Sequence, residues 1–276
     1  MPTLRIVSAA ELRLDELAAL FTDAFAGYLV PVTVSAAAFA ERVCAESIDL
    51  SSSVVMLREA PVALALVARR GRESRLASMG VIPSARRTGA AAALLARVLD
   101  DARARGDRWL RLEVFETNLP ARALYERAGF RPLARLVGYE GDAIVKQAAP
   151  LVEVDACELG RRVARDLPPL ELPWQLEPTS LMVPPSTAHA FTVDGSAMVL
   201  VSQVGPERAW LRALHTLPAE RRRGHATRLV GALAAQLHPR TLVFSALYPE
   251  NLASDVFARL GFRRAELAQL EMALAL

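Results

Sequence analysis

An internal repeat is the feature of this sequence that most restricts how the chain can fold. A block that begins near Val81 returns near Thr216, and each copy contains a proline, then Arg-x-x-Gly-x-Ala, then a helix-like stretch. The repeated motif residues are Arg86, Gly89 and Ala91 in the first copy and Arg221, Gly224 and Ala226 in the second. Self-similarity at one spacing is the signature of a duplicated structural unit, so the sequence predicts two similar domains.

The two copies also agree beyond this motif. Each continues into a strand-like run (109–115 and 241–247), an asparagine (Asn118 and Asn251) and a Gly-Phe-Arg segment (129–131 and 261–263). The spacing between the copies shrinks from 135 to 132 positions along the chain, as small deletions would produce. Chance similarity between alanine-rich helices is the alternative, but agreement of two blocks in the same order favours duplication.

Hydrophobic patterning predicts strands and helices in both halves. In the first half we expect strands at 3–7, 53–58, 61–69, 74–82, 109–115 and 130–140, and helices at 9–26, 35–47, 88–105 and 119–128. In the second half we expect helices at 158–166, 223–237 and 252–259, and strands at 188–193, 197–204, 208–215, 241–247 and 263–274. This order predicts an α/β fold (α+β in some schemes) with domains at 1–147 and 148–276.

Composition and charge exclude several classes of protein. The chain has 276 residues and a net charge of +3, without the clustered basic excess expected of a nucleic-acid binder. Cys44 and Cys157 lack the spacing of a disulfide framework or a metal site, which indicates a reduced compartment and no bound metal. Apolar runs are interrupted by charges, and the N-terminus does not resemble a signal peptide. We therefore expect a cytoplasmic monomer or homodimer with no membrane or nucleic-acid partner.

The repeated loop has the properties of an anion site. The first N–H groups of a helix have no partner within the helix, and the helix dipole adds partial positive charge there. A pyrophosphate can bind at such an end, and the small residues at 89–91 and 224–226 let the backbone approach it closely. Ordinary exposed charge is the alternative interpretation of the arginines at 86–87 and 221–223. The loop lacks the glycine patterns of a P-loop and of a dinucleotide fingerprint.

Together with the segment 121–130, Ala-Arg-Ala-Leu-Tyr-Glu-Arg-Ala-Gly-Phe, this loop resembles the GNAT superfamily of acyl-CoA-dependent N-acyltransferases. The likeness covers residues 3–140 closely and 188–275 more weakly. The first half is especially similar to the bacterial N-terminal alanine acetyltransferases of ribosomal proteins, and the pair of copies is similar to tandem GNAT proteins. The resemblance implies a mixed, mostly antiparallel central sheet flanked by helices in each domain. It also implies acetyl-CoA (CoA) as co-substrate, and no metal.

The same resemblance implies which residues bind CoA. They are Val81, Arg86, Arg87, Thr88, Gly89, Ala90, Ala91 and Asn118 in the first half and Arg222, Arg223, Gly224, His225 and Ala226 in the second. A backbone N–H near Val81 is expected to polarise the thioester carbonyl. For His225, simple exposure at a helix start is an equally good interpretation.

Two residues of the first half are candidates for acid–base catalysis. Tyr125 matches the family's general acid, which protonates the departing thiolate; a core aromatic residue is the alternative. Glu113 has the placement of the base proposed for the ribosomal-protein acetyltransferases, and a salt-bridged strand residue is an equally good interpretation. In the second half Phe257 stands in the place of Tyr125, and Ser245 or Phe244 in that of Glu113. We therefore expect the second half to be catalytically degenerate.

The sequence thus predicts an acetyl-CoA-dependent N-acetyltransferase whose acceptor, a small molecule or a peptide, attacks directly through a primary amine. Two alternatives stay open: a non-catalytic CoA-binding or sensing protein, and catalysis in the C-terminal half. The loop at 222–227 favours the latter and the missing tyrosine opposes it. His189, His215 and His238 are isolated in the sequence, so core or surface placement is expected for each. A fold does not define a substrate, and the acceptor stays open at this point.

Overall fold

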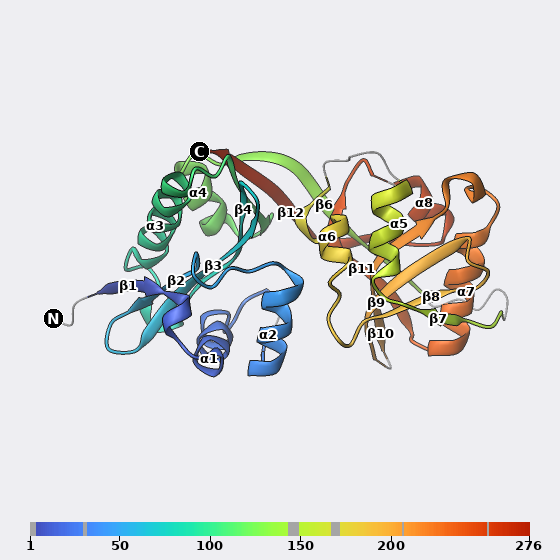
Figure 1. Cartoon of the computed structure of the whole chain (residues 1–276), viewed down its shortest axis with the longest axis horizontal. Coiled ribbons are helices and arrows are strands. Elements are labelled where there is room, and N and C mark those ends of the chain that lie inside the picture. Colours follow the sequence, from blue (N-terminus) through green and yellow to red (C-terminus); the bar gives the residue numbers. More distant parts are fainter. Residues whose placement is uncertain (1–3, 30–31, 143–148, 167–171, 206, 253) are drawn as a thin grey trace. The chain divides into compact units, whose positions relative to one another are not determined.

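The computed structural model describes residues 4–29, 32–142, 149–166, 172–205, 207–252 and 254–276 (Figure 1). Contacts divide the chain into unit 1, residues 1–133 and 271–276, and unit 2, residues 134–270. Most of strand β6 (Arg131–Asp142) therefore belongs to unit 2, and the end of strand β12 (Arg263–Ala275) belongs to unit 1. The predicted boundary between residues 147 and 148 lies outside the described residues.

Unit 1 is built on a sheet whose strands follow the order of the chain. Its elements are β1 (Arg5–Ser8), α1 (Leu14–Ala24), α2 (Ala36–Ala45), β2 (Val54–Leu57), β3 (Pro61–Arg70), β4 (Glu73–Val81), α3 (Ala90–Arg105), β5 (Trp109–Phe115) and α4 (Leu119–Arg127). The strand order is β1-β2-β3-β4-β5, followed by the end of β12. The β4–β5 pair is parallel, and the pairs that join β1 to β4 are antiparallel.

Helices cover both faces of this sheet. Residues 62–68 of β3 are buried without alternation, so the strand has no solvent-facing side. Both α1 and α3 contact β3, and Figure 1 shows α1 and α2 on the opposite side of the strands from α3. The buried stripes of the two helices include Leu17 and Phe21 in α1 and Leu94 and Val98 in α3. The core of unit 1 therefore has two layers, one on each face of the sheet.

Unit 2 repeats this plan with shorter helices before its sheet. Beyond β6, its elements are β7 (Val152–Val154), α5 (Glu158–Asp166), α6 (Pro178–Leu181), β8 (His189–Thr192), β9 (Ala197–Val204), β10 (Arg208–Thr216), α7 (His225–Leu237), β11 (Thr241–Pro249), α8 (Ser254–Arg259) and most of β12. The strand order β6-β11-β10-β9-β8-β7 contains one parallel pair, β10–β11, and four antiparallel pairs. The expected mixed, mostly antiparallel sheets flanked by helices are confirmed.

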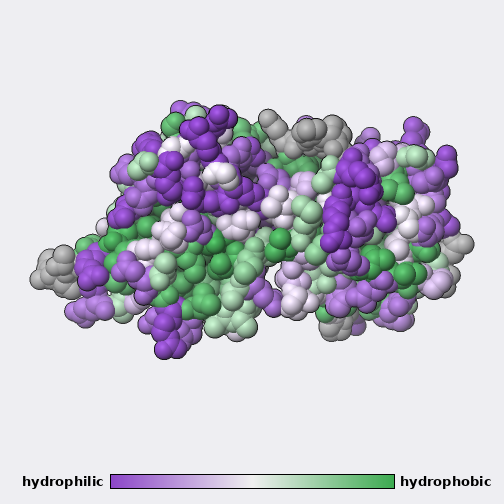
Figure 2. All heavy atoms as spheres, viewed as in Figure 1, coloured by the Kyte–Doolittle hydropathy of each residue, from purple (hydrophilic) through white to green (hydrophobic). Residues whose placement is uncertain are grey.

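Two apolar clusters hold unit 2 together. In the first, Phe257 of α8 stacks on Tyr139 of β6 with 3.9 Å between ring centroids, and Phe244 of β11 packs against their edges. In the second, Leu159 and Val163 of α5 pack on strands β8 to β10. The opposite face of α5 is charged and forms a hydrophilic stripe on the surface (Figure 2). This amphipathic pattern fixes which side of α5 faces the sheet.

Some helices begin later than the sequence pattern predicts. The expected helix at 9–26 is divided, because Ser8 caps a short 3-10 turn at Ala9–Glu11 and α1 starts only at Leu14. Helices α3 and α7 start at Ala90 and His225, one residue after a glycine in the left-handed conformation. Helix α3 ends at Gly106, as expected, with φ of 73°.

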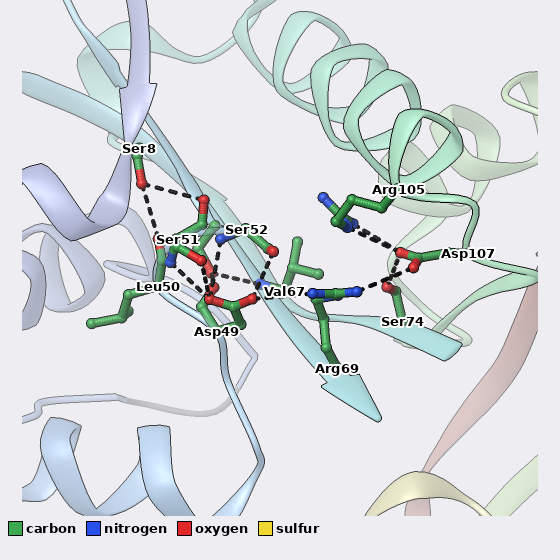
Figure 3. A network of polar contacts seen from close by, with 11 residues as sticks. Ser8, Asp49, Leu50, Ser51, Ser52, Val67, Arg69, Ser74, Arg105 and Asp107 are labelled. Carbon is green, nitrogen blue, oxygen red and sulfur yellow. Dashed lines mark hydrogen bonds and ion pairs between the residues drawn. The ribbon is translucent and has the colours of Figure 1, made fainter. Parts of the chain in front are cut away.

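A polar cluster fixes the turn that leads from α2 into β2 (Figure 3). Asp49 accepts hydrogen bonds from the hydroxyl groups of Ser51 at 2.5 Å and Ser52 at 2.7 Å, and from the Ser51 N–H at 2.9 Å. Arg69 lies 3.5 Å from Asp49 and 3.4 Å from Asp107. Burial opposes the charge of Asp49, but the hydrogen bonds from Ser51 and Ser52 outweigh it and lower the pKa of Asp49 to about 2.

We expect Asp49→Asn to lower the free energy of unfolding by about 1–2 kcal/mol, because an amide cannot accept all the hydrogen bonds that a carboxylate accepts. Wild-type stability should fall as the pH drops from about 4 toward 2, because the carboxyl group with the lowered pKa takes up its proton more readily in the unfolded chain. Urea unfolding followed by circular dichroism at pH 7 and pH 3 measures both effects. Equal stability of variant and wild type at pH 7 would contradict this role of Asp49.

Candidate functional site

The two repeated loops have the same backbone conformation. In unit 1 the loop joins β4 to α3, and in unit 2 it joins β10 to α7. Arg87 and Arg222 both have φ of 65°, and Gly89 and Gly224 have φ of 86° and 84°. Each loop also contains a 3-10 turn, at Pro83–Ala85 and Pro218–Glu220. The sequence repeat is therefore a structural repeat.

Both loops present unpaired helix N–H groups to open space. The first hydrogen bond of α3 runs from the N–H of Ala93 to the carbonyl of Gly89 at 3.0 Å, so the N–H groups of residues 90–92 precede the helical ladder. A Cβ added at Gly89 or Gly224 would meet no atom within 4 Å. Positive φ, rather than crowding, therefore requires glycine at both positions. The space in front of each helix can accept an anionic group.

The end of β4 directs a further N–H group away from the paired strands. Ile82 donates its N–H to the carbonyl of Val62 on β3 at 3.0 Å. Because alternate residues of an antiparallel strand face opposite edges, the N–H of Val81 points toward β5. The parallel pairing of β4 with β5 ends at Leu76 and Leu112, before the strand reaches Val81. The Val81 N–H therefore lies where the β4–β5 ladder has ended.

Arg86 holds the loop in place with its side chain. Its guanidinium donates to the carbonyls of Val81 at 3.0 Å, Ala24 at 3.2 Å and Ala26 at 2.9 Å. The corresponding Arg221 donates to the carbonyl of Thr216 at 3.4 Å. Arg86 is among the residues that the family resemblance assigns to CoA binding. The structure gives its side chain three backbone partners, so a contact with an anion would come from its main chain.

Tyr28, Asn118 and Tyr125 form a polar group beside the start of α4. Asn118 caps α4 by accepting the N–H of Ala121 at 3.3 Å. Tyr28, which follows α1, makes a side-chain hydrogen bond with Asn118, and its ring centroid lies 6.0 Å from that of Phe115. Tyr125 on α4 is 7% exposed. No sequence motif marks Tyr28, because its partners come from a segment about ninety residues away.

The two tyrosines keep their protons at neutral pH. Burial, followed by the neighbouring Tyr28, raises the pKa of Tyr125 well above the usual value of a phenol. Burial also raises the pKa of Tyr28, and the hydrogen bond with Asn118 opposes this effect. A phenol in this state can donate a proton to a developing anion but does not serve as a base.

Glu113 lies in a buried network of ion pairs. One carboxylate oxygen lies 2.8 Å from Nε and 2.7 Å from Nη2 of Arg75, and these side chains are 4% and 3% exposed. Arg75 also lies 2.8 Å from Glu46, which lies 3.1 Å from Arg42 on α2. Of the two interpretations made from the sequence, this geometry favours the salt-bridged strand residue over the catalytic base.

Glu113→Gln should therefore lower the free energy of unfolding by about 3 kcal/mol, because it removes one partner of a buried ion pair. The matched control is Glu126→Gln, which breaks a pair with Arg122 at 3.8 Å in which Glu126 is 46% exposed, and it should change stability by less than about 1 kcal/mol. Urea unfolding at pH 7 measures both variants. If Glu113→Gln has wild-type stability and a large loss of turnover, the interpretation of Glu113 as the catalytic base would be favoured instead.

Several charged side chains of the second loop have ion-pair partners. The ring nitrogens of His225 lie 2.9 Å from Asp194 and 3.2 Å from Glu220, and Arg223 lies 3.2 Å from Glu220. Arg222 is exposed. His225 and Ala226 form the first turn of α7, where the main-chain N–H groups face outward as in α3. An anion would therefore meet the backbone of this loop and Arg222 before the other side chains.

Strand register identifies the counterparts of the catalytic candidates in unit 2. The parallel pairing of β10 with β11 ends at Leu211 and Phe244, as that of β4 with β5 ends at Leu76 and Leu112. Ser245 thus corresponds to Glu113, and the buried Phe257 takes the place of Tyr125. Unit 2 lacks both side chains that the sequence singled out for catalysis in unit 1.

Two further features bear on the class of site. Within the described ranges, no group of three or more His, Cys, Asp or Glu side chains could hold a metal ion. In that same part of the chain, no helix is long and apolar enough to cross a membrane.

Comparisons with known proteins agree with this geometry. Residues 21–130 match the model of the acetyltransferase (GNAT) family, and residues 195–270 match that of FR47-like protein. A putative acetyltransferase from Pyrococcus horikoshii has a similar structure, with a TM-score of 0.68 and 16% identity over 99% of this chain and 89% of that one. A tandem GNAT protein from the clavulanic acid biosynthesis pathway gives a TM-score of 0.67 and 16% identity over 99% and 98% of the two chains. A GCN5-related N-acetyltransferase from Sphaerobacter thermophilus gives 0.65 and 15% over 99% and 95%.

These structural likenesses show the fold, and the family models identify the two matched segments. No curated protein matches the chain. The fold and the loop geometry define an acyltransferase of the GNAT type. The chain carries a GNAT acetyltransferase domain at residues 21–130 and an FR47-like domain at residues 195–270, and its fold is similar to that of a tandem GNAT protein. Acetyl-CoA is the co-substrate of that family.

Proposed function

We propose that unit 1 transfers an acetyl group from acetyl-CoA to a primary amine, carried by a small molecule or a peptide. The observation that carries this proposal is the loop at 81–91, where open helix N–H groups and a strand-end N–H lie on one short segment. The pyrophosphate of CoA binds to the main chain of residues 87–91 at the start of α3. The thioester carbonyl then accepts a hydrogen bond from the N–H of Val81.

The chemistry needs one nucleophile, one polarised carbonyl and one proton donor. The neutral amine attacks the thioester carbon, so that a C–N bond forms and the C–S bond breaks. Tyr125 donates its proton to the departing thiolate, and the proton lost from the amine nitrogen returns the phenol to its neutral form through water. The phenol of Tyr125 is protonated throughout the neutral range, so the acid form that this role requires is present.

Tyr28 and Asn118 are assigned to positioning. The hydrogen bond between their side chains joins the segment after α1 to the start of α4, the helix that carries Tyr125. Arg86 has a similar role for the loop, because it joins the end of α1 to the end of β4. Three parts of unit 1 that are distant in the sequence are thereby held around one reaction centre.

A thiol-release screen of the purified protein tests the proposal. Acetyl-CoA is supplied at a fixed concentration, and the panel contains protein N-terminal peptides, lysine peptides, polyamines, aminoglycosides and free amino acids. We expect at least one amine to raise the rate of thiol release above the rate in its absence. Binding of acetyl-CoA without release for any amine would favour the non-catalytic CoA-binding protein.

A further inference from the structure

Unit 2 contains a pocket of about 660 Å³ beside the second loop. Pockets that hold small molecules and cofactors have volumes of roughly 300–1,000 Å³. The walls are mainly apolar and include Val163 of α5, Leu181 of α6 and Phe257 of α8, whereas Arg222 and Gly224 of the loop form another part. A ligand with an anionic group and a less polar body fits these surroundings.

A histidine–aspartate pair borders this pocket through its histidine, and the aspartate also pairs with Arg165 at 2.7 Å. His215, near the end of β10, lines the pocket, and its Nε2 lies 3.1 Å from Oδ2 of Asp166 at the end of α5. The two side chains are 5% and 10% exposed. Neutral histidine satisfies this contact when Nε2 carries the proton and donates it to the carboxylate. Nδ1 is then the nitrogen that can accept a proton.

The pair is placed beside the backbone group that would polarise a carbonyl. Leu217 donates its N–H to the carbonyl of Ser196 at 2.9 Å, on the side of β9. Because successive N–H groups of a strand face opposite edges, the N–H of Thr216 points toward β11. His215 is the residue next to Thr216. Its counterpart in unit 1 is Gly80, where a Cβ would lie 2.9 Å from the Cβ of Ala24. The histidine is therefore a feature of the second copy that the first copy has no room for.

Other polar groups of the pocket are less suited to accept a proton. The hydroxyl of Tyr248 donates to the carbonyl of Arg212 at 2.9 Å. Glu220 pairs with His225 and Arg223. Phe257 has no polar atom. His225 also lines the pocket, but each of its ring nitrogens lies within 3.2 Å of a carboxylate, whereas His215 has its carboxylate partner at Nε2. This arrangement favours His215 as the base.

Several charges act on His215 from the elements around it. Burial lowers the pKa of His215 below its usual range, Asp166 on α5 opposes that effect, and Arg221 of the loop and Arg162 of α5 reinforce it. The loop also brings Glu220 and Arg222, and α8 brings Arg259, to the same pocket. The imidazole is therefore neutral at pH 7 and available as a base.

We propose that unit 2 is a second acyl-CoA site, in which His215 is the general base and Asp166 positions it. The proposal goes beyond the function proposed for unit 1, because it places a second site with its own base in unit 2, with the same co-substrate and class of acceptor. A primary amine gives a proton to Nδ1 of His215 as its nitrogen attacks the thioester carbon. The C–N bond forms, the C–S bond breaks, and the thiolate takes the proton from His215. The products are an amide and CoA with a free thiol, and the imidazole is neutral again.

The test uses the full chain with unit 1 impaired by Gly89→Glu and Tyr125→Phe together. Acetyl-CoA is the probe, and thiol release is measured against pH with the amine panel and with water alone. We expect release that saturates with acetyl-CoA and rises with pH as His215 loses its proton. Adding His215→Gln should lower this rate about 10²–10⁴-fold. Adding Asp166→Asn should lower it about 10-fold or more and move the rising limb to lower pH, because the carboxylate no longer raises the pKa of His215.

Controls separate catalysis from folding. His189→Gln removes an exposed histidine that lies 2.6 Å from Glu153, and it should leave the rate and the pH profile unchanged. Circular dichroism and calorimetry with CoA show whether each variant is folded and binds. If His215→Gln does not fold, the pH shift of Asp166→Asn decides, since a purely structural pair would not move the profile.

Three results would overturn the proposal: no thiol release from the chain with unit 1 impaired, an unchanged rate with folded His215→Gln, or an unchanged pH profile with Asp166→Asn. The function proposed for unit 1 is tested separately, in a chain whose second site carries His215→Gln and Gly224→Glu. It fails if adding Gly89→Glu and Tyr125→Phe leaves the rate of that chain intact.

Discussion

Tyr125→Phe should lower turnover about 10²–10⁴-fold while the affinity for acetyl-CoA stays the same. The substitution removes one hydroxyl and keeps the ring, so the packing of this buried side chain is preserved. If the hydroxyl protonates the thiolate only as the C–S bond breaks, its loss affects the transition state and not ground-state binding. In a chain whose second site is silenced by His215→Gln and Gly224→Glu, steady-state thiol release with the best amine of the panel gives turnover, and calorimetry gives the affinity.

The pH profile provides an independent check on Tyr125. Because burial raises the pKa of this phenol, its ionisation should produce no falling limb between pH 6 and 9 in the wild type. Tyr139→Phe is a matched control, since it removes the hydroxyl of a buried tyrosine that belongs to unit 2. Full turnover of Tyr125→Phe across this pH range would assign proton donation to another group.

Gly89→Glu should weaken acetyl-CoA binding to unit 1 about 100-fold. The new carboxylate would face the pyrophosphate at the start of α3, where like charges repel, and the residue would have to adopt φ of 86°. The measurement is calorimetric titration in a chain whose second loop carries Gly224→Glu, so that only the first site is observed. The charge-matched control is Ser84→Glu, an exposed position in the 3-10 turn of the same loop, which should bind as the unsubstituted loop does. Equal affinities of the Gly89 and Ser84 variants would place the pyrophosphate elsewhere.

Much of the fold could be predicted from local sequence patterns. The glycine of Arg-x-x-Gly-x-Ala and the helix that follows are short-range features, and both copies adopt the conformation that the motif implies. The parallel pairs β4–β5 and β10–β11 also follow from a strand–helix–strand order. No local signal indicates that residues 134–142 belong to unit 2 and residues 271–276 to unit 1. The last strands of the two copies have similar sequence patterns, so the sequence does not distinguish them. The domain bounds 1–147 and 148–276, which follow from the sequence repeat, stay a prediction.

The side-chain partners of the site were less accessible to sequence reasoning. Glu113 meets Arg75, 38 residues earlier, and His215 meets Asp166, 49 residues earlier. Neither pair has a characteristic spacing, because each depends on which helix packs over which strand. Tyr28 shares this property through its contact with Asn118. Motifs therefore located the loops and Tyr125, whereas the partners of Glu113 and the base proposed for unit 2 required the tertiary structure.

Direct analysis of the reaction products tests the central claim, that unit 1 is an acyltransferase and not a CoA-binding module. The chain is incubated with acetyl-CoA labelled in the acetyl group and with the amine panel, and mass spectrometry compares N-acetylated amine with free CoA thiol. We expect equal amounts of the two products for at least one amine, and a large loss of both with Tyr125→Phe in a chain whose second site is silenced by His215→Gln and Gly224→Glu. Tight binding of acetyl-CoA with no labelled amide from any amine would contradict it.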